Sequence, residues 1–165
     1  MWHEVSRRNF LTAGTLASAV FLTSGCSLFG ITTSRETIGV VQNDLFPKAK
    51  ALGINTSKYI TIIYRHRKVA QWEKDFLKNG VKWLNESAIE VYKKRYTSLS
   101  PEKRQKVLKT ISETEWGSSW IDSMMHYIFE AMLGDPIYSG NQNFAGWKWL
   151  EFEGGKPRAK KVYLG

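Results

Sequence analysis

The 165-residue sequence contains a single cysteine, Cys26, and only three histidines. One cysteine cannot form a disulfide within the chain, and no Cys-x-x-Cys-His sequence is present for haem attachment. His3 lies in a segment expected to be removed, and neither His66 nor His126 belongs to a zinc-binding motif. These absences exclude a disulfide-stapled scaffold and argue against a metalloenzyme.

Other groups that could carry catalysis are also scarce. No glycine-rich loop stands before a helix, and no βαβ unit is visible that could hold a nucleotide cofactor. Glu113 and Glu115 are two residues apart, so they cannot face each other on a helix. We therefore expect no catalytic residue, no metal and no cofactor in this chain.

The N-terminus has the features of an export signal. Arg7 and Arg8 precede Phe10-Leu11, and no charge occurs from Phe10 to Cys26. This stretch is too short and too rich in small residues to be a spanning helix. Paired arginines before Phe-Leu are typical of the twin-arginine route, which carries folded proteins. We predict that residues 1–25 are a signal peptide read by the twin-arginine translocase, and that the protein is periplasmic and membrane-associated.

Cys26 ends this segment in a sequence similar to a lipobox. Thr23 stands where a branched aliphatic residue is usual, and Leu22 is one place early. A cut after residues 17–19 would leave a very short apolar region. Cys26 is therefore a candidate lipid attachment site, with an intermolecular bridge and an idle thiol as alternatives.

The remaining residues have the length of one domain. Residues 26–36 are polar and are expected to be an irregular tether, whereas residues 37–133 have the apolar periodicity of an all-α helical bundle. Its clearest stripe comprises Val69, Trp72, Phe76, Gly80, Leu84, Ala88 and Val91. The stripe keeps its phase across Gly80, which predicts one continuous helix and close approach of a second helix there.

Local signals place the other helix boundaries. Pro47 must kink or end the first helix, Ser100-Pro101 begins a later one, and Gly134 stops the last. His126 is expected near the inner face of that last helix. Asp44, on the first helix, is expected at most to pair with a nearby lysine.

The chain carries a net charge of +9, which could favour anionic lipids, an acidic partner or nucleic acid. The lysines are dispersed rather than clustered, and export argues against nucleic acid. We expect most of them to be solvated helix surfaces, and no nucleic-acid partner.

Residues 134–165 replace helical periodicity with glycines and aromatic residues, predicting an irregular C-terminal tail. Tyrosine and tryptophan bury large areas with few rotatable bonds, so they often anchor interfaces. Trp147 and Trp149 would lie on the same side of an extended segment. Packing on the chain's own bundle and docking to a partner are both open, and the two can coexist.

The tail contains Asp135-Pro136-Ile137-Tyr138, then Ser139-Gly140-Asn141, and then Gly146-Trp147. This series of motifs resembles the ending of the gluconate 2-dehydrogenase subunit 3 family. This chain departs from it at Ser139 and Glu151, where glycine is common, and at Glu153, where proline is common.

The resemblance implies a non-catalytic small subunit that escorts a folded catalytic subunit through twin-arginine export and stabilises it. FAD would belong to that large flavoprotein dehydrogenase subunit, and haem to a cytochrome c subunit. The candidate partner-binding residues are Tyr138, Gly140, Asn141, Gly146 and Trp147. Two rival hypotheses are a free-standing surface lipoprotein that binds carbohydrate or another protein, and an enzyme in its own right.

Overall fold

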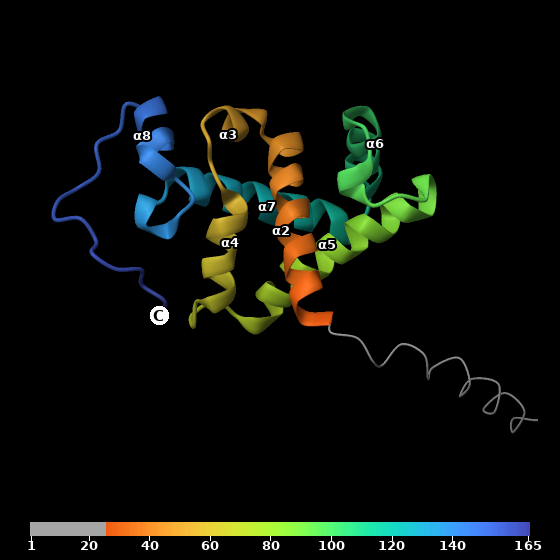
Figure 1. The fold of residues 1–165 in the computed structure, drawn as a ribbon, viewed down its shortest axis with the longest axis horizontal. Coiled ribbons are helices and arrows are strands. Elements are labelled where there is room, and N and C mark those ends of the chain that lie inside the picture. The colour runs from red at the N-terminus through yellow and green to blue at the C-terminus, as the bar shows by residue number, and fades with distance from the viewer. Residues whose placement is uncertain (1–25) are drawn as a thin grey trace, which may run out of the picture. The chain divides into compact units, whose positions relative to one another are not determined.

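The computed structural model describes residues 26–165, with side chains described from residue 34 onward. Over these residues the chain is helical and has no strand, which confirms the predicted all-α class (Figure 1). The helices are α2 (Cys26–Leu45), α3 (Pro47–Ala51), α4 (Thr56–Arg65), α5 (Gln71–Tyr92), η1 (Tyr96–Ser98), α6 (Pro101–Ser112), α7 (Glu115–Leu133), η2 (Pro136–Tyr138), η3 (Gln142–Phe144) and α8 (Ala145–Trp149). None of these helices combines the length and the hydropathy that a membrane crossing requires.

The predicted irregular tether, residues 26–36, is instead the first part of α2. Polarity alone does not end a helix, and no proline occurs in this stretch. The helix ends at Leu45 because Pro47 restricts the residue before it to extended backbone. Pro47 then occupies the first turn of α3, so the predicted break is confirmed.

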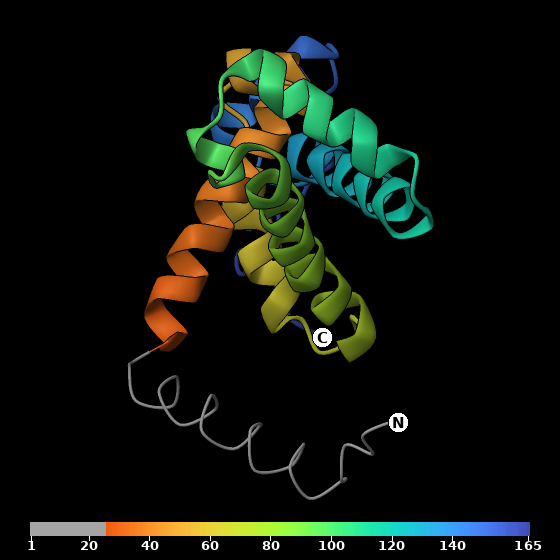
Figure 2. The same ribbon diagram turned by 90° about the vertical axis from the view of Figure 1, so that its right-hand side faces the viewer.

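Residues 32–165 form one unit, which contains a main buried core and a smaller buried cluster that includes Ala49, Ile128 and Met132. α5, α6 and α7 contact one another pairwise, and α4 contacts α7. Figure 2 shows α6 and α7 as a helical hairpin joined by residues 113–114. The most deeply buried large side chains of this core include Ile38, Val41, Ile60, Leu77, Leu84, Ile111, Trp120 and Met124.

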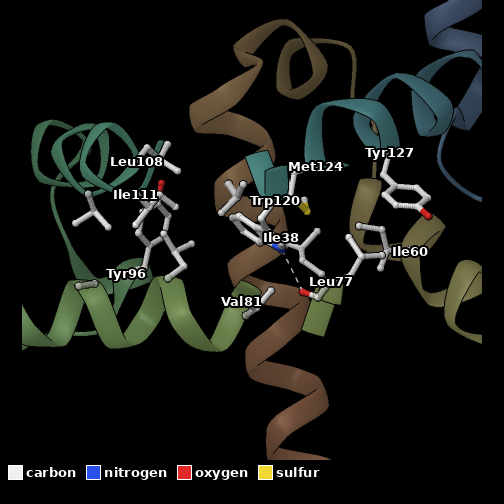
Figure 3. Close-up of a cluster of buried hydrophobic side chains, with 14 of the residues drawn as sticks. Ile38, Ile60, Leu77, Val81, Tyr96, Leu108, Ile111, Trp120, Met124 and Tyr127 are labelled. Atoms are coloured by element: carbon white, nitrogen blue, oxygen red, sulfur yellow. Dashed lines mark hydrogen bonds between the residues drawn. The ribbon is translucent and has the colours of Figure 1, made fainter. Parts of the chain in front are cut away.

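A close helix contact in the core joins Trp120 of α7 to Gly80 of α5. Trp120 is fully buried, and its indole Nε1 donates a hydrogen bond to the Leu77 carbonyl at 3.3 Å (Figure 3). A Cβ placed on Gly80 would lie 2.0 Å from the indole. The predicted continuous helix and the close approach at Gly80 are both confirmed.

The apolar stripe on α5 is wider than the face that the bundle covers. Gly80, Leu84 and Ala88 of the predicted stripe are buried, but Trp72 is 72% exposed and Val91 62% exposed. The spacing therefore predicted the helix correctly and its buried face only in part. Exposed apolar side chains on α5 need a separate explanation.

A bidentate ion pair, largely buried, joins α2 to α6. The Arg104 guanidinium donates to both Asp44 oxygens at 2.6 and 3.0 Å, and the Tyr96 hydroxyl donates to Asp44 Oδ2 at 2.8 Å. The hydrogen bond to Asp44 raises the pKa of Arg104. Burial, followed by the separate hydrogen bond from its own hydroxyl to Asp44, raises the pKa of Tyr96. The prediction that Asp44 pairs with a nearby lysine is therefore wrong. Its partner is Arg104, which lies sixty residues further along the chain.

Substitution of Gly80 by alanine tests the helix crossing. Although alanine favours helix by about 1 kcal/mol, the clash with Trp120 should lower the free energy of unfolding by about 1–3 kcal/mol net. Gly39→Ala in α2 is the matched control, because a Cβ there would meet nothing within 4 Å. Urea unfolding should show Gly39→Ala unchanged or stabilised, and equal stability of both variants would contradict the crossing.

The Tyr64 hydroxyl is buried and has no hydrogen-bond partner among the described residues. Burial raises its pKa to about 12. The folded state therefore favours the neutral hydroxyl. The free energy of unfolding is unaffected by this ionisation below about pH 10, and it falls as pH rises from 10 toward 12.

Tyr64→Phe should leave stability at pH 7 unchanged or about 1 kcal/mol higher, since it removes an unpaired buried hydroxyl. Above about pH 10 the variant should lose less stability, by up to about 1.4 kcal/mol per pH unit. Urea titrations across this range, with the exposed Tyr163→Phe as control, provide the measurement. If Tyr64→Phe lost stability more steeply than the wild type above about pH 10, the inferred direction of the Tyr64 pKa shift would be wrong.

Candidate functional site

The C-terminal segment, residues 134–165, begins by folding over the end of α7. Gly134 ends that helix, and the Asp135 carboxylate accepts a hydrogen bond from the Ile137 N–H at 2.9 Å. The same carboxylate pairs with Arg158 at 2.7 Å. Both bonds hold η2 in place, so the Asp-Pro pair works as a helix stop and a turn cap together.

Asn141 is fully buried at the centre of this segment. Its Nδ2 donates to the Gly134 carbonyl at 3.1 Å, and its Oδ1 accepts from the Gly146 N–H at 2.8 Å. The neighbouring Gly140 carbonyl accepts from the Asn55 N–H at 3.0 Å. Asn141 therefore joins the end of α7 to the start of α8, and its side chain does not face outward to a partner.

Gly140 and Gly146 allow the segment to reach the backbone of α7. A Cβ on Gly140 would lie 2.5 Å from the Ala131 carbonyl oxygen, and one on Gly146 would lie 2.0 Å from that of Met132. Both glycines are buried. This close approach explains why glycine is required at both positions of the motif. Neither residue is exposed for contact with a partner.

Trp147 fastens α8 to the bundle. It is 9% exposed, and its Nε1 donates to the Leu133 carbonyl at 2.6 Å. The Arg158 guanidinium lies 4.3 Å from its ring centre, and the Phe152 ring meets it edge-on at 5.3 Å. The alternative of packing on the chain's own bundle is confirmed for Trp147.

The predicted irregular tail contains a short helix, α8, at its centre. The extended geometry considered for Trp147 and Trp149 is therefore wrong, because a helix turns two such neighbours to different faces. Trp147 points inward, whereas Trp149 is 41% exposed with Lys48 Nζ 5.5 Å from its ring. α8 has only five residues, which is too short for helical periodicity to be recognised in the sequence.

Near the buried motif, exposed large apolar side chains occur in the last turns of α7 and in residues 144–152, which include α8. We call this set the α7–α8 patch: Phe129, Leu133, Phe144, Trp149, Leu150 and Phe152. It holds six of the ten large apolar residues that are exposed in the described chain. The sequence indicated aromatic anchors in this tail but not which of them stay exposed.

Tyr138 lies half-buried rather than at the surface. Its ring meets that of Tyr59 edge-on at 6.5 Å, in a hollow of about 420 Å³ that His66, Glu73 and Glu130 also line. The Tyr59 hydroxyl donates to Glu130 at 3.1 Å, and burial followed by the Glu130 charge raises its pKa.

His126 also lines this hollow, but its side chain is exposed and pairs with Glu130 at 3.1 Å. The inward position predicted for it is wrong by about a quarter-turn of α7, since Tyr127 is the buried neighbour. Across residues 26–165, no three His, Cys, Asp or Glu side chains are grouped as a metal site.

The N-terminal site predictions fall at the edge of the structure or beyond it. Arg7, Arg8, Phe10 and Leu11 lie outside the described residues, so the export signal stays a prediction. Cys26 is the first residue of α2. Its lipidation likewise stays a prediction.

Two departures from the family pattern occupy strained backbone. Ser139 has φ of +63° and Glu151 has φ of +53°, both in the left-handed region that favours glycine. Glycine substitution at either position should raise the free energy of unfolding by about 0.5–1 kcal/mol. Ser139→Ala is the control, since alanine keeps the strain. Thermal melts in which Ser139→Ala gains as much as Ser139→Gly would refute this account.

Trp147→Ala should cost about 3–5 kcal/mol of unfolding free energy, because a large buried side chain and its hydrogen bond are lost. Trp149→Ala, two residues away and exposed, should change stability by less than about 1 kcal/mol. Urea unfolding of the isolated subunit provides the comparison. Comparable losses in both variants would mean that α8 as a whole, rather than Trp147, carries the attachment.

Comparison with known proteins identifies a family. The family model described as Gluconate 2-dehydrogenase subunit 3 matches residues 33–155, from within α2 to just beyond the α7–α8 patch. No curated protein and no solved structure matches the chain.

Proposed function

This chain belongs to the gluconate 2-dehydrogenase subunit 3 family, and we propose that it is the non-catalytic escort of a flavin-dependent catalytic subunit. The family places it as a small subunit of a gluconate 2-dehydrogenase-like complex. In this proposal the large subunit carries FAD, a cytochrome c subunit carries haem, and this chain supplies the twin-arginine signal for the folded, loaded complex.

The observation that carries the proposal is the α7–α8 patch. Large exposed apolar side chains are unfavourable in water, and several of them on neighbouring elements commonly mark a protein interface. Trp149 and Phe152 are the kind of side chain that anchors such interfaces. The buried family motif holds them at the surface, and all six residues of the patch lie within the part of the chain that the family model matches, which supports a docking role.

The export half of the proposal depends on Arg7 and Arg8. A cofactor-loaded flavoprotein must fold before export, and a folded protein cannot be threaded as an extended chain. A signal on a small bound partner solves this difficulty for both chains. Membrane association would follow from acylation of the Cys26 thiol. One acyl chain binds a membrane only marginally, so stable anchoring would need further chains.

Cell fractionation of three variants tests the two halves separately. Arg7→Lys/Arg8→Lys keeps the charge but loses the guanidinium geometry, so both subunits should stay in the cytoplasm. Trp149→Ser/Leu150→Ser should export the small subunit alone and leave the flavoprotein behind. Ile89→Ser/Val91→Ser, which changes two exposed apolar residues of α5, should export both.

The measured quantities are flavin content and dehydrogenase activity in the periplasm and cytoplasm. Deletion of this chain should remove the periplasmic activity without reducing synthesis of the flavoprotein. A flavoprotein that is still exported and active after deletion would refute the escort function.

A further inference from the structure

A second apolar surface lies between α5 and the N-terminal half of α7, away from the α7–α8 patch. It is a groove of about 930 Å³ whose α5 side carries Trp72, Phe76 and Trp83. Trp116 of α7 completes it and meets Trp83 edge-on, with ring centres 5.3 Å apart. Trp72, at 72% exposure, is the most exposed large apolar residue of the described chain.

The groove continues along α5 into a second hollow of about 380 Å³, and both hollows share Trp83 and Trp116. From Trp72 to Glu90 the helix rises about 27 Å, at 1.5 Å per residue. A small molecule does not span that distance. About eight extended residues, or a helix of about eighteen, would span it.

The rim of the groove is acidic, although the whole chain is basic. Within the described chain, no lysine, arginine or histidine lines either hollow. Five carboxylates line them: Glu73, Asp75, Glu86, Glu90 and Glu115. The chain as a whole has 24 basic and only 15 acidic side chains. A partner that fits this groove must therefore be positively charged as well as apolar.

Two of these carboxylates also have a role in the fold. Glu115 lies in the first turn of α7, where it favours the helix, and Glu73 accepts a hydrogen bond from Tyr127. Asp75 and Glu86 meet Lys78 and Lys82 at 3.8 and 3.7 Å, in exposed pairs of little energetic value.

We infer that this acidic aromatic groove is a docking site for a polypeptide segment of a partner that carries arginine or lysine among large apolar side chains. An arginine placed over the exposed Trp72 indole would gain cation–π attraction and a carboxylate neighbour together. Its apolar neighbours would cover Phe76 and Trp83. This surface is separate from the α7–α8 patch and adds a second contact to the proposed complex.

Site-specific cross-linking in intact cells tests the inference. The photoreactive residue p-benzoylphenylalanine replaces Trp72, whose exposure makes the substitution compatible with folding. Adducts should map to one discrete segment that contains arginine or lysine beside aromatic or aliphatic residues. The same residue at Tyr163, an exposed aromatic position outside the groove, is the control.

Charge provides the second readout. Asp75→Asn/Glu86→Gln/Glu90→Gln should lower the Trp72-position adduct on the order of tenfold, as expected for the loss of three rim charges. The control Glu36→Gln/Glu151→Gln/Glu153→Gln removes three exposed carboxylates outside the groove and should leave the yield unchanged.

No adduct above the Tyr163 control, or an adduct segment without a basic residue, would overturn the inference. So would an unchanged yield after the groove carboxylates are neutralised. The same cross-linker at Phe152 reports the α7–α8 patch. An adduct with the flavoprotein at Phe152 but none at Trp72 would leave the escort function intact and reject the groove.

Discussion

The indole of Trp120 against the backbone of α5 at Gly80 is the contact on which the bundle depends. Any side chain larger than hydrogen at Gly80 would occupy the space of the ring, since even a Cβ would lie 2.0 Å from it. The contact lets α7 approach α5 closely enough for the indole N–H to reach the Leu77 carbonyl. Because α7 also contacts α4, α6 and α8, its position on α5 sets where each of those helices can lie.

The far end of α7 shows how a sequence motif can serve a function indirectly. Asn141, Gly140 and Gly146 are buried against the last turn of α7, where unsatisfied carbonyls need donors. The Trp147 indole supplies one such donor, to Leu133. These residues hold the tail in one conformation, and the side chains between and beyond them are the ones that stay exposed. In the proposed escort, the motif would thus position the docking face without contacting the partner itself.

Charge is distributed unevenly over this basic chain. One carboxylate, Asp44, is used inside the fold, where Arg104 and Tyr96 satisfy both of its oxygens. Others gather around the aromatic groove of α5 and α7. The two ends of α7 therefore carry surfaces of different chemistry, an apolar patch and an acidic aromatic groove. Two such surfaces suit a subunit that contacts its complex at more than one place.

The sequence by itself determined the all-α class, the continuity of α5 through Gly80, the helix boundaries at Pro47, Pro101 and Gly134, and the family. These features depend on local spacing, on proline and glycine geometry and on a short motif, all of which are visible along the chain. Only the tertiary structure decided that Trp72 stays exposed, that His126 faces outward, and that Asp44 pairs with Arg104. It also decided that Asn141 is buried while Trp149 is not. Such outcomes depend on which surfaces of distant segments meet, and periodicity within one helix carries no information about that.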